Sequence, residues 1–252
     1  MERMALIFGL CAVLGAARAS AQTESPVVGV GPFLHIVSDL DQSLAFYHDH
    51  LGLEVTGPPG PHNFTDNPAV ANLYGVPGKQ FRAAVLKIAG SEMGIELVQW
   101  GEARSPRRKW VAGSGTMTLV LRRAGGDHKA LQDPDGFPVE VERATNPGAG
   151  LSVSVLNVGK ATELWHGSFG LKSDQIQFTG SKPAASSAPF PEPGQGMLRL
   201  FVRNVSALTA SLKAAGFSVI TTGGEPVTLP QGQRVIILRD PNNFFLQLME
   251  RP

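Results

Sequence analysis

The stretch "VSDLDQSLAFYHDHLGLEV", residues 37–55, is the most informative about the fold. It starts with the end of an apolar run that favours a strand. Apolar side chains then recur at the spacing of one helix face, at Leu40, Leu44, Tyr47 and Leu51. Gly52 follows and suits the C-terminal stop of a helix. The stretch therefore predicts a strand, a short helix and a glycine stop.

The same order of elements returns later in the chain. "LHIVSDLDQSLAFYHDHLGL" (residues 34–53) parallels "SVSVLNVGKATELWHGSFGL" (residues 152–171). After the first copy, strands are predicted near residues 81–88 and 94–100. After the second copy the chain runs into "TGSKPAASSAPFPEPGQG", a composition typical of a loop. The strands that should follow the second copy are therefore expected to be missing.

A second repeat lies in the turns that close the units. "DPDGFPVEV" (residues 133–141) returns as "DPNNFFLQL" (residues 240–248), and the similar segments "GTMTLVLR" and "GMLRLFVR" precede them. Between segment and turn, the later copy has room for a helix capped by Ser206 and for a further strand. The earlier copy has only "RAGGDHKAL", which is too short for both. "DPDG" itself is typical of a turn. It does not match an EF-hand calcium loop, because such a loop needs its glycine at the sixth position and Gly136 is fourth.

Four units of strand, helix and strands are therefore predicted, the first and fourth complete and the second and third cut down. The boundary between the halves falls in "ATNPGAG", residues 144–150. We expect an N-terminal domain over residues 28–146 and a C-terminal domain over residues 149–252. In an alternative arrangement, the complete first and fourth units pair with each other and the fragments become edge pieces.

The first 21 residues are interpreted as a secretory signal. Arg3 precedes an apolar run over residues 4–17, and Ala19-Ser20-Ala21 provides an A-x-A cleavage site. We expect a periplasmic or secreted protein without a stable membrane span; the alternative is an uncleaved apolar anchor. The one cysteine, Cys11, lies in this segment, so Cys-based metal sites are excluded from the mature chain. A net charge of +1 gives no footprint for nucleic acid.

At these motifs the chain resembles the vicinal oxygen chelate superfamily, which holds glyoxalase I, bleomycin- and fosfomycin-resistance proteins and extradiol dioxygenases. The resemblance is carried by "VSDLDQSLAFYHDHLGLEV", "IELVQW", "DPDGFPVEV" and "RDPNNFFLQL", and it covers most of residues 28–252. It implies an α+β fold of tandem βαβββ modules whose curved sheets enclose a cleft. It does not fix the reaction, because this fold hosts many chemistries.

The resemblance also implies where a metal ion would bind. In metal-binding members each unit offers two ligands, commonly a His early in its first strand and a Glu in its last strand. In this chain the first-strand positions fall on Pro32, Thr116, Gly150 and Met197. The last-strand positions fall on Glu96, Glu140 and Gln247, and the third unit is expected to lack that strand. The N-terminal half thus keeps both carboxylates and neither imidazole.

Two interpretations of these carboxylates remain open. Glu96 and Glu140 facing one cleft could bind a hard divalent cation or share a proton. Alternatively, they are solvated or arginine-paired residues of a degenerate cleft. His35 could substitute for a missing imidazole, but it lies three residues from Pro32 and should face the opposite side as a core histidine, unless a bulge rotates it.

Three further residues are expected to line the substrate cleft. Val98 and Trp100 share a strand face with Glu96, and Thr116 occupies a ligand position of the second unit. Core packing is the other interpretation of Trp100.

The expected function is that of an exported glyoxalase-like protein that binds a small molecule and has a degenerate metal site, hence no cofactor. One alternative is a divalent-metal-dependent lyase or dioxygenase-like enzyme that uses Glu96 and Glu140 with one non-standard ligand. Another is a structural or partner-binding remnant whose cleft is filled by side chains. A homodimer is also compatible with the sequence.

Overall fold

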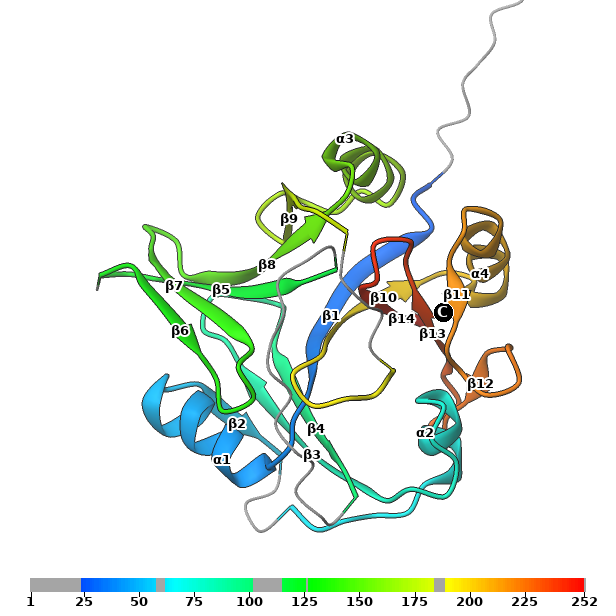
Figure 1. Cartoon of the computed structure of the whole chain (residues 1–252), viewed down its shortest axis with the longest axis horizontal. Helices are drawn as coiled ribbons and strands as arrows, with labels where there is room; N and C mark the ends of the chain where they lie inside the picture. Colours follow the sequence, from blue (N-terminus) through cyan, green and yellow to red (C-terminus); the bar gives the residue numbers. More distant parts are fainter. Residues whose placement is uncertain (1–23, 58–61, 102–114, 126, 184–188, 252) are drawn as a thin grey trace, which may run out of the picture.

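The computed structural model describes residues 24–57, 62–101, 115–125, 127–183 and 189–251, which form two β-sheets with short helices (Figure 1). The predicted α+β class is confirmed. The predicted signal segment lies outside the described residues. Among the helices that can be described, none has the length and apolarity that crossing a membrane requires.

The larger sheet combines the first and fourth units, as the alternative arrangement predicts. Its nine strands run in the order β11-β13-β14-β10-β1-β4-β3-β2, with β12 paired to β13. The first unit contributes β1 (Val27–Ile36), β2 (Glu54–Thr56), β3 (Phe81–Lys87) and β4 (Ile95–Trp100). The fourth contributes β10 (Gly196–Val202), β11 (Ser218–Val219), β12 (Val227–Thr228), β13 (Arg234–Arg239) and β14 (Phe245–Glu250). The units join through the antiparallel pair β1 and β10 at the centre of the sheet.

The second and third units form a sheet of their own, so the expectation that they are edge pieces is wrong. Its five strands run in the order β6-β7-β5-β8-β9. They are β5 (Met117–Arg123), β6 (Lys129–Gln132), β7 (Pro138–Arg143), β8 (Gly148–Val155) and β9 (Ile176–Gly180). β9 lies parallel to β8 as β4 lies parallel to β1. The third unit therefore keeps its last strand, contrary to expectation, and lacks the hairpin before it.

The helices begin at side-chain caps. In the first unit, α1 (Leu40–Leu44) continues into a π-helical segment, η1 (Ala45–His50); in the third, α3 (Val158–Thr162) continues into η2 (Glu163–Ser168). The other helices are α2 (Pro68–Leu73) and α4 (Val205–Ala214). Asp39 caps α1, Asn157 caps α3, and Asn204 caps α4 by accepting the Ala207 N–H. The predicted cap Ser206 is therefore wrong, because it lies inside the first turn of α4.

The repeat between the first and third units extends to single hydrogen bonds. His48 Nδ1 lies 2.7 Å from the carbonyl oxygen of Leu53, and His166 Nδ1 lies 2.6 Å from that of Leu171. In both units a glycine with positive φ ends the helix, at 67° for Gly52. These histidines therefore stabilise helix ends.

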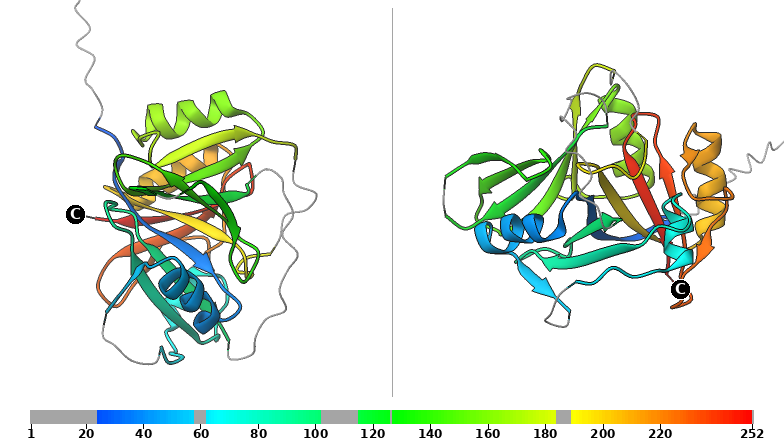
Figure 2. Two further views of the ribbon diagram at one scale, coloured as in Figure 1. Left: turned by 90° about the vertical axis from the view of Figure 1, so that its left-hand side faces the viewer. Right: turned by 60° about the horizontal axis from the view of Figure 1, so that its bottom comes forward.

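Two hydrophobic cores lie on opposite faces of the nine-stranded sheet. The larger core lies between the two sheets and contains Phe33 and Leu97 from one sheet and Leu119 and Val139 from the other. The smaller core covers the other face of the nine-stranded sheet, where α2 packs. Figure 2 shows the two sheets from two further directions. Because side chains alternate along a strand, the neighbours of a core residue point away from that core.

Candidate functional site

One face of the nine-stranded sheet gathers the ligand positions of the first and fourth units. Glu96 is paired with Leu34, and Leu34 with Met197. Gln247 is paired with Arg199 in the same way. Paired residues on neighbouring strands point to the same side of a sheet. We call this side the Arg199 face and define it by Glu96, Val98, Trp100, Met197, Arg199 and Gln247.

Arg199 joins the two last-strand ligand positions of this face. Its Nη2 forms an ion pair with Glu96 Oε2 at 2.9 Å, and its Nε donates a hydrogen bond to Gln247 Oε1. The Arg199 stem passes over Gly31, where an added Cβ would lie 2.7 Å from Arg199 Cδ. The register of β1 shifts between Val30 and Phe33, next to this glycine. The bulge and the missing Cβ together make room for the guanidinium.

These polar groups are largely removed from water. The side chains of Arg199 and Glu96 are 14% and 20% exposed, and Gln247 is 1% exposed. A buried ion pair is favourable only when both charges are well paired, and Arg199 has partners on two sides. Burial raises the pKa of Tyr74, and the nearby Glu96 carboxylate raises it further, so this hydroxyl stays protonated.

Aromatic rings cover one end of the Arg199 face. Tyr74 packs between Trp100 and Phe190, with distances of 5.0 Å and 5.7 Å between the ring centroids. The ring centroids of Phe190 and Phe245 lie 4.3 Å apart. Val98 and Trp100 therefore share the face with Glu96, where the alternation predicts them, but both are also buried in the smaller core. Trp100 Nε1 is buried and has no hydrogen-bond partner within the described residues. A buried N–H donor left without a partner is costly.

The five-stranded sheet carries the remaining ligand positions. Ser152 on β8 is paired with Gln177 on β9 as Leu34 is paired with Glu96, so Gln177 holds the last-strand position of the third unit. Each sheet thus offers one glutamate and one glutamine, and Glu140 is the glutamate of the smaller sheet.

The register also changes the assignment of Thr116. Leu119 is paired with Leu151 as Leu198 is paired with Phe33. Thr118, the residue before Leu119, therefore matches Met197, the residue before Leu198, so the first-strand position falls two residues after Thr116. Thr116 precedes β5 of the smaller sheet and does not join Val98 and Trp100 on the Arg199 face.

The structure does not bring Glu96 and Glu140 together. Glu96 lies on β4 of the larger sheet, between the core residues Ile95 and Leu97. Glu140 lies on β7 of the smaller sheet, next to the core residue Val139. Both side chains therefore point away from the core that the sheets share, from opposite sides of it. They cannot bind one ion or share one proton.

A second arginine fills the space at the first-strand position of β8. Arg122 Nη1 donates to the carbonyl oxygen of Asp174 at 2.9 Å, and Arg122 Nε lies 3.8 Å from Glu142 Oε2. A Cβ added to Gly150 would lie 3.1 Å from Arg122 Nη1 and 2.3 Å from the Asp174 carbonyl oxygen. A histidine at position 150 would therefore clash with backbone and guanidinium.

The donor sets of the two sheets do not fit the metal ion that the resemblance implies. The first-strand positions hold Pro32, Met197, Gly150 and Thr118, none of which supplies an imidazole. On the Arg199 face, Glu96 and Gln247 already bind a guanidinium. A metal ion would have to compete with this fixed positive charge.

His35 lies on the opposite side of β1 from the Arg199 face, as the count along the strand predicts. It is fully buried, with Nε2 2.6 Å from Asp133 Oδ2 and Nδ1 3.0 Å from the Gln195 carbonyl oxygen. Burial alone would lower the pKa of His35, but the Asp133 carboxylate raises it above its ordinary value. Burial likewise would raise the pKa of Asp133, but the His35 charge lowers it.

Sequence reasoning missed two groups of this region. Arg199 is the one charged residue inside the apolar stretch "MLRLFV", which was its only local signal. Asp133 and Asp135 were interpreted only as turn residues, whereas they also contact the first unit through His35 and the Ser38 N–H.

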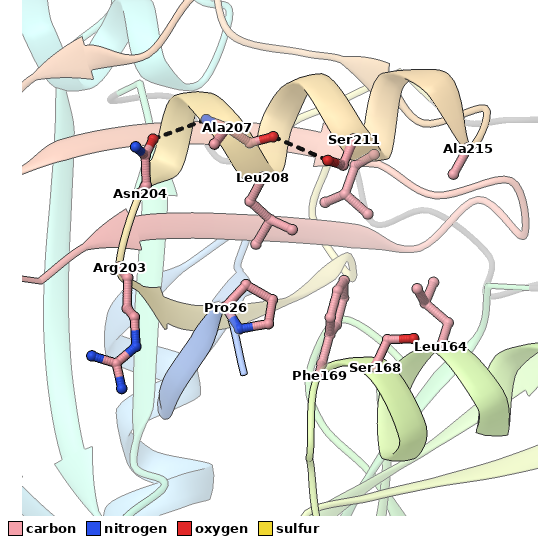
Figure 3. A pocket seen from close by; sticks show the side chains of 11 residues that line it. Pro26, Leu164, Ser168, Phe169, Arg203, Asn204, Ala207, Leu208, Ser211 and Ala215 are labelled. Atoms are coloured by element: carbon pink, nitrogen blue, oxygen red, sulfur yellow. Dashed lines mark hydrogen bonds between the residues drawn. The ribbon is translucent and has the colours of Figure 1, made fainter. Parts of the chain in front are cut away.

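A groove of about 430 Å³ lies between η2 and α4 (Figure 3). Its lining is mostly apolar and includes Phe169, Leu208 and Leu212. Arg203 at its rim forms an ion pair with Glu24 at 3.0 Å. Phe169, Leu208 and Leu212 belong to the larger core, which lies on the other side of the nine-stranded sheet from the Arg199 face. The groove is therefore separate from that face.

Comparison with known proteins agrees with this architecture. Residues 29–141 match the family model of the Glyoxalase/Bleomycin resistance protein/Dioxygenase superfamily. None of the curated proteins matches the chain. A glyoxalase I mutant from Zea mays is similar in structure, with a TM-score of 0.58, 15% identity, and coverage of 86% of this chain and 90% of that one. A putative dioxygenase from Bacillus subtilis has a TM-score of 0.57 and 13% identity, with 90% and 86% covered. At such identities the likeness establishes the fold alone.

Proposed function

We propose that this chain, which matches the Glyoxalase/Bleomycin resistance protein/Dioxygenase superfamily over residues 29–141 and has the fold of glyoxalase-type proteins, is an exported protein that binds a small molecule without the family's metal ion. The observation that carries the proposal is the Arg199 guanidinium between Glu96 and Gln247. It provides a positive charge between the two last-strand ligand positions.

The guanidinium suits a ligand that has an oxygen acceptor. Arg199 uses Nε and Nη2 for Gln247 and Glu96, and Nη1 has no hydrogen-bond partner in the described part of the chain. A guanidinium held from two sides presents its remaining N–H groups in a fixed direction, which favours a carbonyl or carboxylate oxygen. Because Glu96 neutralises the charge, recognition would depend on hydrogen-bond direction more than on net charge.

The enzyme alternative that uses Glu96 and Glu140 together has no support, because the two carboxylates lie on different sheets. The remnant alternative is favoured by one observation. Met197 and Tyr74 are 0% and 3% exposed, so protein side chains fill part of the Arg199 face. A binding experiment must therefore separate a ligand site from a closed face.

Export is supported by the order of Arg3, the apolar run and Ala19-Ser20-Ala21. Mass spectrometry of the protein isolated from its producing cells should find a mature N-terminus at Gln22. An intact N-terminus on the accumulated protein would contradict export by cleavage.

Ligand binding is tested with a panel of small carboxylates and hydroxyketones, followed by the fluorescence of Trp100 and the other tryptophans. We expect at least one compound to bind and the Arg199→Met variant to bind it about 10- to 100-fold more weakly, because a hydrogen bond to a charged group is lost. Arg122→Met is the matched control on the other sheet and should leave the affinity unchanged. No binding across the panel would favour the remnant alternative, and equal affinity of Arg199→Met and wild type would place the ligand away from Arg199.

A further inference from the structure

A cluster of three metal-ligating side chains lies away from the Arg199 face, where the turn between β6 and β7 meets β1. His35, Asp133 and Asp135 are 0%, 5% and 3% exposed. Each offers a nitrogen or oxygen atom, and these atoms lie within 4.8 Å of one another. Ligand atoms that share one ion at about 2.0–2.2 Å lie about 3–4 Å from one another. To share a cation, the 2.6 Å contact between His35 Nε2 and Asp133 Oδ2 would have to open slightly, and any separation longer than about 4 Å would have to shorten.

The surroundings orient the histidine as a ligand. His35 Nδ1 lies 3.0 Å from the Gln195 carbonyl oxygen, which can only accept a hydrogen bond, so the Nδ1–H donates. In neutral His35 this leaves the lone pair on Nε2, the atom that faces Asp133. A backbone carbonyl that fixes the tautomer in this way is typical of metal-binding histidines.

The two carboxylates are held differently. Asp133 Oδ1 accepts the N–H groups of Asp135 and Phe137 at 2.9 and 2.8 Å, and Oδ2 accepts the Tyr47 hydroxyl at 3.2 Å. Asp135 Oδ2 accepts the Ser38 N–H at 2.9 Å. Asp135 Oδ1 is buried and has no hydrogen-bond partner within the described residues. An unpartnered buried carboxylate oxygen is unfavourable and calls for a positive group beside it.

We propose that His35, Asp133 and Asp135 form a buried divalent-cation site that fastens the turn of the second unit to the first strand of the first unit. An imidazole with carboxylates favours Zn²⁺ or Mn²⁺ over Mg²⁺ and Ca²⁺. Three protein ligands leave an open position. The site differs from the ligand positions on the Arg199 face, since His35 points to the other side of the sheet.

The test loads the full mature chain with Zn²⁺ during refolding, because the cluster is buried. After removal of free ion, the zinc content and the midpoint of thermal unfolding are measured, with Mg²⁺ and Ca²⁺ as separate arms. We expect one Zn²⁺ per chain and a higher midpoint with Zn²⁺. In the wild type, Co²⁺ should give the visible absorption of a low-symmetry nitrogen and oxygen site.

Asp135→Asn is the informative variant, because its amide oxygen can still accept the Ser38 N–H. It should weaken Zn²⁺ binding by about 100-fold or more, since outer-shell changes alone weaken sites by about 10- to 100-fold. Glu96→Gln and Glu140→Gln are matched controls that should keep the ion. Absence of Zn²⁺ from the refolded wild type would overturn the proposal and leave a protonated His35–Asp133 pair. Unchanged binding by folded Asp135→Asn would also overturn it, by placing the ion on surface histidines.

Discussion

At the scale of single residues, Arg199 joins Glu96 and Gln247 on its face, and we propose that it also contacts the ligand. The sequence places this arginine in an apolar strand but does not show that its guanidinium crosses β1 to reach Glu96. That contact depends on the β1 bulge, on Gly31 and on the pairing of strands far apart in the chain. None of these follows from local spacing, whereas the missing imidazoles at Pro32 and Met197 follow from the family resemblance.

The two copies of the closing turn differ in one partner. Asp133 faces His35, and the position equivalent to His35 in the third unit is Val153, a core residue. Within the described residues, the carboxylate of Asp240, the counterpart of Asp133, accepts hydrogen bonds from Asn242 and Phe244 and has no histidine beside it. Burial therefore raises the pKa of Asp240 to about 6, although these hydrogen bonds lower it in part. The pKa of Asp133 is lowered instead.

This difference predicts a pH effect at Asp240. Its folded pKa of about 6 lies above the unfolded value of 3.8, so its stabilising contribution is complete below pH 3.8 and is lost as the pH rises through about 6. Between pH 3.5 and pH 7.5, Asp240→Asn should gain roughly 2–3 kcal/mol of unfolding free energy relative to wild type. Urea unfolding at both pH values measures the gain. A difference that does not change with pH would show that Asp240 titrates normally.

At the scale of elements, the sequence predicts the helix of the fourth unit but misplaces its start. Asn204 and Ser206 are both residue types that cap helices, and the backbone conformation decides which of them caps α4. Asn204 has an extended backbone, with φ −145°, and its side chain accepts the Ala207 N–H (Figure 3). Asn204→Ala should lower the unfolding free energy by about 1 kcal/mol. Among the described residues, the hydrogen bond that Ser206→Ala removes is an exposed one donated by Arg234, so this variant should stay within about 0.5 kcal/mol of wild type. Chemical denaturation measures both, and a larger loss in Ser206→Ala would contradict the assignment.

The strand β9 shows why the third unit looked incomplete. The first unit places two strands between its helix and β4, whereas the third unit goes from η2 to β9 without them. The segment Ile176–Gly180 therefore does not stand where the full pattern predicts a strand. It also has few apolar residues that would indicate one. β9 lies beside β8 because the two strands pair through backbone hydrogen bonds, and local propensity does not predict such pairing.

At the scale of the whole molecule, the repeats predict four units, and the observed pairing of the first unit with the fourth is one of the two arrangements that the sequence allows. The repeats do not show which units pair, because register and partner depend on contacts between distant strands. Each of the two sheets contains strands from before and from after residue 147. The division into domains at residues 146 and 149 stays a prediction. A homodimer also stays a prediction. The same pairing separates Glu96 from Glu140, which no inspection of either half could reveal.

We propose that the Arg199 guanidinium occupies the place that a metal ion takes in metal-binding glyoxalase-type proteins. Elemental analysis of tag-free mature wild type beside Glu96→Gln and Glu140→Gln is the sharpest test. If the guanidinium occupies this place, all three proteins should have the same divalent-metal content, whether or not an ion occupies the His35 cluster. A stoichiometric ion in wild type that is lost in Glu96→Gln would contradict it.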